Sequence, residues 1–413
     1  MLRAPLAQPL ARRRECIKMM SPSFLGAAIV FVLLGAFVRW QWPVLFAGTR
    51  RRDYLTHCLL QRSKEFHAIG ESRRKARLDV SLIRVAQVDI SDSLQAVAKA
   101  HMGSLLSLFF PAKIHNPSLL LTEDEALFAF RVKKPMETWG SLLYLGAMDK
   151  QELLHRLFSS TDSDVGVLRL PENVWRVSPQ HAGNTLKMRD ARLVSVNREV
   201  YALGAERVDC WQSRLAPVSA NMRIDTARGG TVHTPGTCAK NLAPVLENHS
   251  DQLQLADMMS GEIARVTTHG DFLSSSAIRH LYQASGKRGC LKPGNWRGST
   301  PIVPVDSKTF LTVVHARFRC GEGDADLCYI HTMLLLERND DDEFECVDAL
   351  PFDLLPVEQW ELGQFSFAVG LAVVAAADGD VVDADDGSVT TLVSFGVDDQ
   401  LGAVAAFRVS VKE

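Results

Sequence analysis

Residues 309–337 read TFLTVVHARFRCGEGDADLCYIHTMLLLE and contain two runs that are typical of β-strands, TFLTVVH and IHTMLLLE. Both runs are short and rich in Val, Leu, Thr and Phe, which favour strands. The polar, glycine-containing stretch between them is typical of a hairpin loop. We therefore predict a β-hairpin here, and similar patterns recur through most of the chain after residue 80.

The recurring strand pattern predicts an all-β body. The β-type runs include residues 119–131, 191–203, 366–374, 390–396 and 402–411, whereas the best helical patterns are residues 150–158 and 278–285. Several units repeat a polar stretch with Pro, an apolar strand, a turn and a second strand, at a spacing of roughly 40–60 residues, and about five such units fit after residue 110. This spacing favours a five-bladed β-propeller over a sandwich, with polar stretches meeting at a central funnel.

The formal net charge of −2 hides a basic head on an acidic body. Residues 1–80 carry 15 Lys/Arg and 5 Asp/Glu, whereas residues 339–400 carry 16 Asp/Glu and no Lys or Arg. Because the excess of positive charge lies outside the folded body, we expect no nucleic acid among the partners. The alternating acids of residues 378–386 lack the order and the closing Glu of an EF-hand, so we interpret them as a solvated hairpin tip rather than a calcium loop.

The amino-terminal segment predicts a membrane anchor. Residues 19–42 are almost uncharged, reach roughly the 20 residues that a membrane-spanning helix needs, and end with Trp residues suited to the membrane interface. Basic residues within 1–18 place that tail in the cytosol, and residues 43–80 form a charged stem. The layout predicts a single-pass type II membrane protein with residues 81–413 in the Golgi or endoplasmic reticulum lumen. A cleaved secretory signal or a mitochondrial presequence is the alternative.

The eight cysteines include no C-x-x-C pair, which disfavours zinc ribbons and thioredoxin-like sites. Cys320 and Cys328 flank the loop of the opening hairpin, where they form either a disulfide in an oxidising lumen or two free, buried thiols. The sequence has no G-x-S-x-G, H-E-x-x-H, Walker A or G-x-G-x-x-G pattern. We therefore expect neither a cofactor nor a metal site.

Six ordered stretches resemble a known family. They are HNPSLLL…FAFRV (115–132), KMRDARLVSVNREVYAL (187–203), KNLAPVL (240–246), WRGSTPIVPVDSKTFLTVVHAR (296–317), CYIHTMLLLE (328–337) and VSFGVDDQLGAVAAF (393–407). Their order and placement resemble the five-bladed propeller of glycoside hydrolase family 130, the β-mannoside phosphorylases, and related eukaryotic propeller-type glycosyltransferases. No single stretch is specific, and the resemblance covers the chain from about residue 110 to its end.

The resemblance implies inverting glycosyl transfer or phosphorolysis of β-linked, mannoside-like sugars. It makes Asp190 the candidate general acid, which protonates the leaving glycosidic oxygen, and Asp399 a carboxylate that orients sugar hydroxyls. Where the family has a motif similar to Glu-Asp-Pro-Arg, this chain has Arg189 and Ala191 beside Asp190. A neighbouring Arg lowers the pKa of a carboxyl group, opposite to what a general acid needs at neutral pH. The alternatives are a turn Asp190 paired with Arg189 or Arg192, and a β-turn Asp399.

The resemblance also implies a sugar phosphate or nucleotide sugar as donor and a glycan as acceptor. Cationic and hydrogen-bonding side chains suit a phosphate or diphosphate. Lys240, His315 and Tyr329 resemble the family's phosphate and sugar contacts, and Arg131, Asn116 and Arg297 complete the predicted substrate- and phosphate-binding residues. The alternatives are a strand-end His315 bonded to backbone, and ordinary surface ion pairs for Lys240 and Arg131.

Two other functions compete with glycosyl transfer. The departure at Arg189 and Ala191 motivates a non-catalytic propeller that binds carbohydrate or protein. The other hypothesis is a glycoside hydrolase of the neighbouring propeller clans. Such an enzyme needs at least two carboxylates flanking the glycosidic bond.

Overall fold

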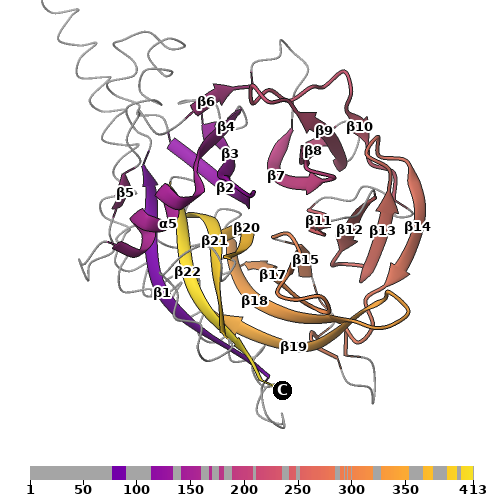
Figure 1. Ribbon diagram of the computed structural model, residues 1–413. Helices are drawn as coiled ribbons and strands as arrows, with labels where there is room; N and C mark the ends of the chain where they lie inside the picture. Colours follow the sequence, from indigo (N-terminus) through magenta and orange to yellow (C-terminus); the bar gives the residue numbers. More distant parts are fainter. Residues whose placement is uncertain are drawn as a thin grey trace, which may run out of the picture. The chain divides into compact units, whose positions relative to one another are not determined.

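The chain divides into two units, Met1–Cys58 and Leu59–Glu413, and every residue described below belongs to the second. The computed structural model describes residues 77–89, 113–133, 141–159, 167–169, 176–180, 188–207, 211–234, 241–247, 252–283, 289–292, 294, 296–298, 300–319, 327–352, 366–374, 388–397 and 401–412. These residues form five sheets arranged around a ring (Figure 1), so the predicted all-β, five-bladed propeller is confirmed.

In blades 1 to 4 the chain starts at the strand nearest the axis and continues outward (Figure 1). Blade 5 also starts at its inner strand, but its two outer strands come from earlier in the chain. Blade 1 contains β2 (Lys113–Leu121), β3 (Glu125–Lys133), β4 (Ser141–Asp149) and β6 (Arg176–Pro179). Blade 2 contains β7 (Arg189–Val196), β8 (Glu199–Arg207), β9 (Trp211–Val218) and β10 (Gly230–Thr231). Blade 3 contains β11 (Ala243–Val245), β12 (Leu253–Asp257), β13 (Glu262–Val266) and β14 (Phe272–Ala277).

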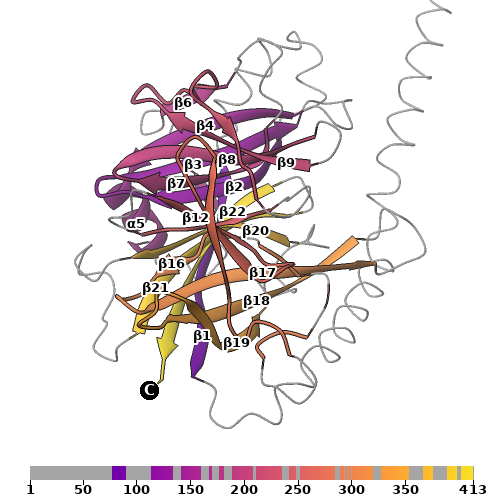
Figure 2. The ribbon, with the colours of Figure 1, turned by 90° about the vertical axis from the view of Figure 1, so that its right-hand side faces the viewer.

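The remaining two blades hold the opening stretch and the carboxyl terminus. Blade 4 contains β15 (Trp296–Gly298), β16 (Val303–Pro304), β17 (Thr309–Arg319), β18 (Leu327–Arg338) and β19 (Phe344–Phe352). Blade 5 contains β20 (Ser366–Val374), β21 (Ser388–Val397), β22 (Leu401–Val411), β1 (Leu78–Asp89) and β5 (Val167–Arg169). Figure 2 shows the strands of blades 1 and 2 on the side of the ring opposite β17, β18 and β19.

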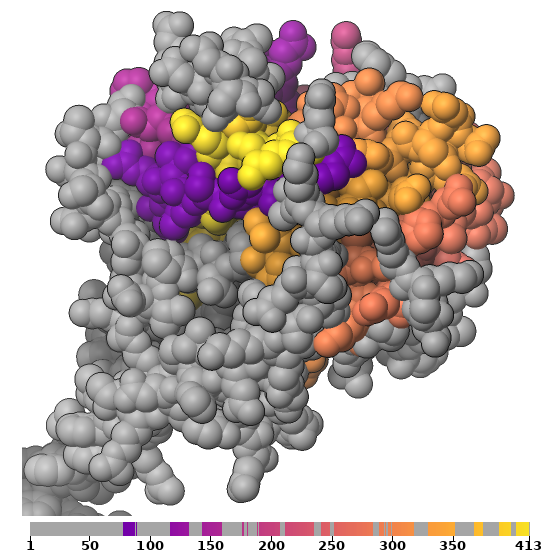
Figure 3. Space-filling view, turned by 90° about the horizontal axis from the view of Figure 1, so that it is seen from below, coloured from indigo at the N-terminus to yellow at the C-terminus, as the bar shows by residue number. Residues whose placement is uncertain are grey.

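The ring closes through β1, which comes from the far end of the sequence. β1 pairs antiparallel with β22, from Leu78 opposite Val411 to Val88 opposite Gly402, and the two strands run side by side on the surface in Figure 3. The carboxylate of Asp348 in β19 accepts N–H bonds from Arg77 at 2.9 Å and Leu78 at 3.0 Å. β1 therefore begins within the last residues of the predicted stem, pairs with β22 and is hydrogen-bonded to β19 of blade 4.

The hydrophobic core explains why five sheets make a ring. It consists of five clusters, and each lies between two neighbouring blades. In β18, residues 333–336 (MLLL) are all buried, because both faces of the sheet are covered by other sheets. Sheets that are apolar on both faces bury both of them only when the ring is complete.

Several details differ from the sequence-based expectations. The helix predicted at residues 150–158 is confirmed as α5 (Lys150–Ser159), but residues 278–283 are not helical. Arg279 N–H bonds to the Phe344 carbonyl at 2.8 Å, and His280 takes a left-handed φ of 56°, which ends any regular element there. The runs 119–131 and 191–203 are each two strands of a hairpin rather than one strand.

A disulfide that the sequence did not predict joins Cys290 to Cys346. It ties the segment after blade 3 to β19 of blade 4. Cys320 and the side chain of Cys328 lie outside the described residues, so the disulfide considered for them is untested.

The predicted tail, membrane anchor and acidic tip at residues 378–386 lie outside the described residues, as does the stem up to residue 76. Among the residues that are described, no helix is both long and apolar enough to cross a membrane.

Candidate functional site

The inner strands β2, β7, β11, β15 and β20 begin at one end of the central axis and end at the other, because each blade starts from its inner strand. The end at which they begin carries buried polar groups from all five blades, and we call it the polar end. We call the opposite end the apolar end. Most of the described site residues that were predicted from the sequence lie at the polar end.

Asp190 is the centre of the polar end. Its Oδ1 accepts a hydrogen bond from Asn116 Nδ2 at 3.1 Å and forms an ion pair with Arg131 Nη1, also at 3.1 Å. The side chains of Arg131 and Asp190 are only 20% and 11% exposed. The structure therefore brings together three of the predicted site residues, from strands β2, β3 and β7 of two neighbouring blades.

Local backbone distortion aims two of these side chains. The pairing of β2 with β3 is interrupted between His115 and Ser118, and that of β7 with β8 between Arg189 and Arg192. Within these bulges Asn116 and Asp190 have left-handed φ values of 45° and 49°. Bulges re-aim side chains, and Asn and Asp are the non-glycine residues that best tolerate this conformation.

Asn241, directly before β11, repeats this arrangement in blade 3. Its φ is 66°, its side chain is buried, and its Oδ1 has no hydrogen-bond partner among the described residues. A buried amide oxygen without a partner has a cost that a ligand donor could remove. The sequence-based prediction chose the neighbouring Lys240 and missed Asn241.

Two glycines let the backbone approach these residues closely. A Cβ on Gly396 in β21 would lie 2.5 Å from Asn116 Oδ1, and one on Gly298 in β15 would lie 2.6 Å from the Asn241 carbonyl oxygen. Both distances are shorter than any real contact, so each position requires glycine.

Arg192 links Asp190 to blade 4. It is buried, and its Nη2 donates to the Gly298 carbonyl at 3.3 Å. Burial lowers the pKa of Arg192 to about 10, while the negative charge of Asp190 acts in the opposite direction. Arg192 is therefore a cation at neutral pH, and Asp190 lies between the charges of Arg131 and Arg192.

The second group of predicted residues lies in blades 4 and 5. His315 in β17 is buried and packs edge-on against Tyr329, with ring centroids 5.4 Å apart, and against Phe367 of β20 at 4.8 Å. Arg297 is directly opposite His315 in the sheet. Its Nε is buried and has no hydrogen-bond partner within the described part of the chain.

His331 in β18 is the pairing partner of His315 in the sheet. It is fully enclosed, and burial lowers its pKa to about 3. Its Nε2 accepts the Ala368 N–H at 3.4 Å, which suits a neutral imidazole.

The predicted site residues therefore fall into two groups, Asn116–Arg131–Asp190 and Arg297–His315–Tyr329, connected by Arg192 and Gly298. Lys240 and Asp399 lie outside the described residues. The structure pairs Asp190 with Arg131 by an ion pair, and that pair is too enclosed to be an ordinary surface ion pair. Asn241 and Phe367 were missed, and Arg192 was named only as an alternative ion-pair partner of Asp190. The polar residues Asn116 and Asp190 near the start of β2 and β7 were the signal that could have revealed Asn241, two residues before β11.

Among the described residues, no three His, Cys, Asp or Glu side chains are grouped so that they could hold a metal ion.

Comparison with known proteins finds similarity at the level of fold. No known protein family and no curated protein matches the chain. Similar solved structures include one described in work on the GH130 family of mannoside phosphorylases, which "contains glycoside hydrolases that target beta-1,2 mannosidic linkages in Candida mannan" (11% identity, TM-score 0.46, 72% of this chain and 84% of that one). Others are a glycosyl hydrolase from Bacteroides ovatus (12%, 0.42, 72% and 84%) and a GH43_1 enzyme from Xanthomonas citri (9%, 0.41, 76% and 92%). The family that the sequence motifs resemble is thus among the similar structures.

Proposed function

We propose that this protein is a carbohydrate-active enzyme that transfers a glycosyl group with inversion, making or phosphorolysing β-linked, mannoside-like sugars. The observation that carries the proposal is Asp190: an enclosed carboxylate at the propeller axis, set in a left-handed backbone bulge and held by Asn116 and Arg131. Strained backbone around a buried charged group is typical of functional sites. The family resemblance supports the choice of sugar chemistry.

The donors on Asp190 favour the synthetic direction. An amide N–H and a guanidinium N–H on one oxygen stabilise the ionised carboxylate. Breaking a glycosidic bond needs a protonated acid, whereas making one needs a base that accepts the proton of the acceptor hydroxyl. Asp190 is the same group in both directions, and the ionised form is the one ready for synthesis.

The second group of residues suits the anionic part of a donor. Arg297 has a buried Nε without a described partner, and His315 and Tyr329 pack beside it from β17 and β18. A phosphate or diphosphate would give Arg297 the acceptor that its Nε lacks. We propose that Lys240 and Asp399 complete the site, with Lys240 on the phosphate and Asp399 on sugar hydroxyls.

A transfer assay on the full chain tests this function. The chain is incubated with oligosaccharide acceptors and a panel of sugar 1-phosphates and nucleotide sugars, and the wild type is compared with Asp190→Asn. We expect transfer from at least one donor and a loss of about a hundredfold or more in the variant. Equal rates in the two proteins, or no transfer from any donor, would overturn the proposal.

A non-catalytic sugar-binding propeller is the second candidate. The observation favouring it is that Asp190 is flanked by Arg189 and paired with Arg131, an environment that also suits a carboxylate receiving sugar hydroxyls. Calorimetry with the same sugars would then detect binding without turnover. A hydrolase would instead release free sugar in the absence of phosphate.

We also propose that the propeller lies in the Golgi or endoplasmic reticulum lumen, anchored by residues 19–42 in type II orientation. The Cys290–Cys346 disulfide supports this location, because such bonds persist in oxidising compartments. Peptide mapping of the protein purified from its own membranes, with thiols alkylated, should recover the linked peptide, and an added protease should spare the propeller in sealed vesicles. Free Cys290 and Cys346 thiols would contradict this placement.

A further inference from the structure

The apolar end of the axis contains a cavity that the proposed function does not use. Its volume is about 790 Å³, within the range of roughly 300–1,000 Å³ that small-molecule sites occupy. Its lining comes from blades 1, 3, 4 and 5, and consists of Leu120, Leu121, Leu246, Glu247, Val303, Pro304, Val305, Asp306, Ser307, Phe310, Arg338, Ala372 and Val373.

The cavity is separate from the site around Asp190. In β2, Asn116 contacts Asp190 whereas Leu120 and Leu121 line the cavity, four and five residues further along the strand. At about 3.3 Å per residue this places them roughly 13–16 Å apart along the strand. β18 repeats the separation, with His331 at the polar end and Arg338 at the cavity.

The cavity wall is mainly aliphatic. Leu121, Leu246, Val305 and Val373 come from four different blades, and all four are only partly buried. Elsewhere in the ring such side chains are packed between blades. Apolar surface turned toward an open space of this size would bind a hydrocarbon group by the hydrophobic effect.

Charge at one side of the cavity selects the sign of a ligand. Arg338 is the cation of the lining, and it is already engaged: it pairs with Glu247, its Nε lies 3.3 Å from Asp342, and its guanidinium covers the rings of Phe310 and Phe344 at 4.8 Å. The lining holds two carboxylates, Glu247 and Asp306, against this one guanidinium. The unbalanced charge is negative.

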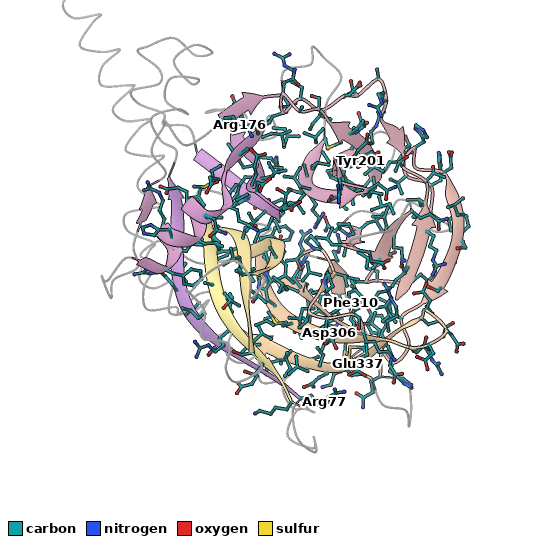
Figure 4. All side chains as sticks on the ribbon, in the orientation of Figure 1. Arg77, Arg176, Tyr201, Asp306, Phe310 and Glu337 are labelled. Atoms are coloured by element: carbon teal, nitrogen blue, oxygen red, sulfur yellow. A yellow bond between two sulfur atoms is a disulfide. The ribbon has the colours of Figure 1, made fainter. Side chains whose placement is uncertain are left out.

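Asp306 is the carboxylate that remains for a ligand. It lies in the turn between β16 and β17, close to Phe310 in Figure 4, and its Oδ1 accepts the backbone N–H groups of Lys308 and Thr309, each at 2.7 Å. Burial acts to raise the pKa of Asp306, but these hydrogen bonds outweigh it and the pKa is lowered. Asp306 is therefore ionised at neutral pH, and the turn holds its carboxylate, which is exposed to solvent, at the edge of the cavity.

We propose that this cavity is a second ligand site, which takes a small amphipathic cation: an alkyl- or arylammonium whose hydrocarbon part lies against the aliphatic wall and whose ammonium group meets Asp306. The site lies at the opposite end of the axis from Asp190, so it is independent of the glycosyl-transfer proposal.

Calorimetric titration of the full chain with octylammonium tests the site, with octanol and octanoate as probes of the same chain length. We expect octylammonium to bind at least tenfold more tightly than octanol, and octanoate to bind more weakly still. Asp306→Asn keeps the Oδ1 acceptor of the turn and should abolish the preference for octylammonium over octanol. The matched control is Asp340→Asn, because Asp340 is a neighbouring carboxylate that is 94% exposed and lies outside the cavity; this variant should change nothing.

Filling the cavity tests the hydrophobic half of the proposal. Val305→Trp should remove binding of both octylammonium and octanol, and Ala372→Leu serves as a smaller filling if the Trp variant does not fold. Equal binding of octylammonium and octanoate, unchanged selectivity in Asp306→Asn, or binding that survives a folded, filled variant would each overturn the proposal. So would the absence of any binding to the wild type.

Discussion

The two ends of the propeller axis are built from the same strands but differ in chemistry and in backbone strain. β18 carries the buried His331 at the polar end and the ion-paired Arg338 at the apolar end. At the polar end three non-glycine residues, Asn116, Asp190 and Asn241, have left-handed φ values. None of the described residues that line the cavity at the apolar end does.

This difference shows which parts of the fold can carry functional residues. The faces of each sheet must be apolar, because each packs against two neighbouring blades. The residues at the ends of the inner strands do not pack between blades, so they need not be apolar. At the polar end the left-handed residues Asn116, Asp190 and Asn241 are buried, whereas at the apolar end the left-handed residues Asn197 and Arg198 lie in the exposed turn after β7. Backbone strain at buried polar residues is typical of functional sites.

The largest expected effect concerns His331 and the pH dependence of folding. The pKa of His331 is lowered from 6.5 to about 3, so the unfolded chain binds a proton that the folded chain does not. The stabilisation is complete above pH 6.5 and is lost as the pH falls toward 3, by about 4 kcal/mol. Denaturant titrations across this range should show a much shallower fall for His331→Gln than for the wild type.

The control for this measurement is His155→Gln, in the exposed face of α5, which should leave the wild-type pH dependence unchanged. A His331→Gln protein that loses stability as steeply as the wild type below pH 6.5 would show that the polar end is not the source of the acid sensitivity.

The next effect compares an arginine at each end. Arg131→Met removes the ion-paired cation from Asp190, leaving Arg192, and should lower kcat/KM by about a hundredfold, since hydrogen bonds to charged groups contribute about 1.5–3 kcal/mol. Arg338→Met removes an equally enclosed ion pair at the apolar end and should change kcat/KM by less than about twofold per folded molecule. Steady-state kinetics on both variants measures this difference. Equal losses of kcat/KM would contradict the claim that only the polar end takes part in catalysis.

The smallest expected effect concerns strain at Asn241. Asn241→Gly relieves a left-handed backbone and removes a buried amide oxygen without a described partner, so the free energy of unfolding should rise by about 1 kcal/mol. Sugar binding should weaken about tenfold. The control is Asn197→Gly in the exposed turn after β7, where φ is 51°. It should gain stability without losing binding; the idea fails if Asn241→Gly binds sugar as well as the wild type.

The propeller could be predicted from the sequence because its strands and their repetition are visible in local sequence patterns. Strands such as residues 309–315 and 330–337 can be recognised from their own residues. About five such units at a regular spacing indicate a propeller. The closing strand β1 could not be found in this way, since its partner β22 lies more than 300 residues away. The Cys290–Cys346 pairing has the same difficulty, because cysteine counts do not define connectivity.

The site was predicted in part for a similar reason. The family resemblance singled out Asp190, while Asn116 and Arg131 were added as candidate substrate-binding residues, and the structure brings the three together. Arg192 and Asn241 matter through their burial and through their closeness to Gly298 of blade 4, which Arg192 reaches from blade 2 and Asn241 from blade 3. Neither property is visible in a one-dimensional pattern.

The central claim is that Asp190 exchanges a proton with the glycosidic oxygen, and leaving-group dependence tests it most directly. Phosphorolysis of β-mannobiose and of 2,4-dinitrophenyl β-mannoside is measured with the full-length wild type and Asp190→Asn. A sugar alkoxide must be protonated as it leaves, whereas dinitrophenolate need not be. The variant should be about a thousandfold slower on the disaccharide but within about tenfold of the wild type on the dinitrophenyl substrate. An equal loss on both substrates, or no loss on the disaccharide, would contradict the assignment.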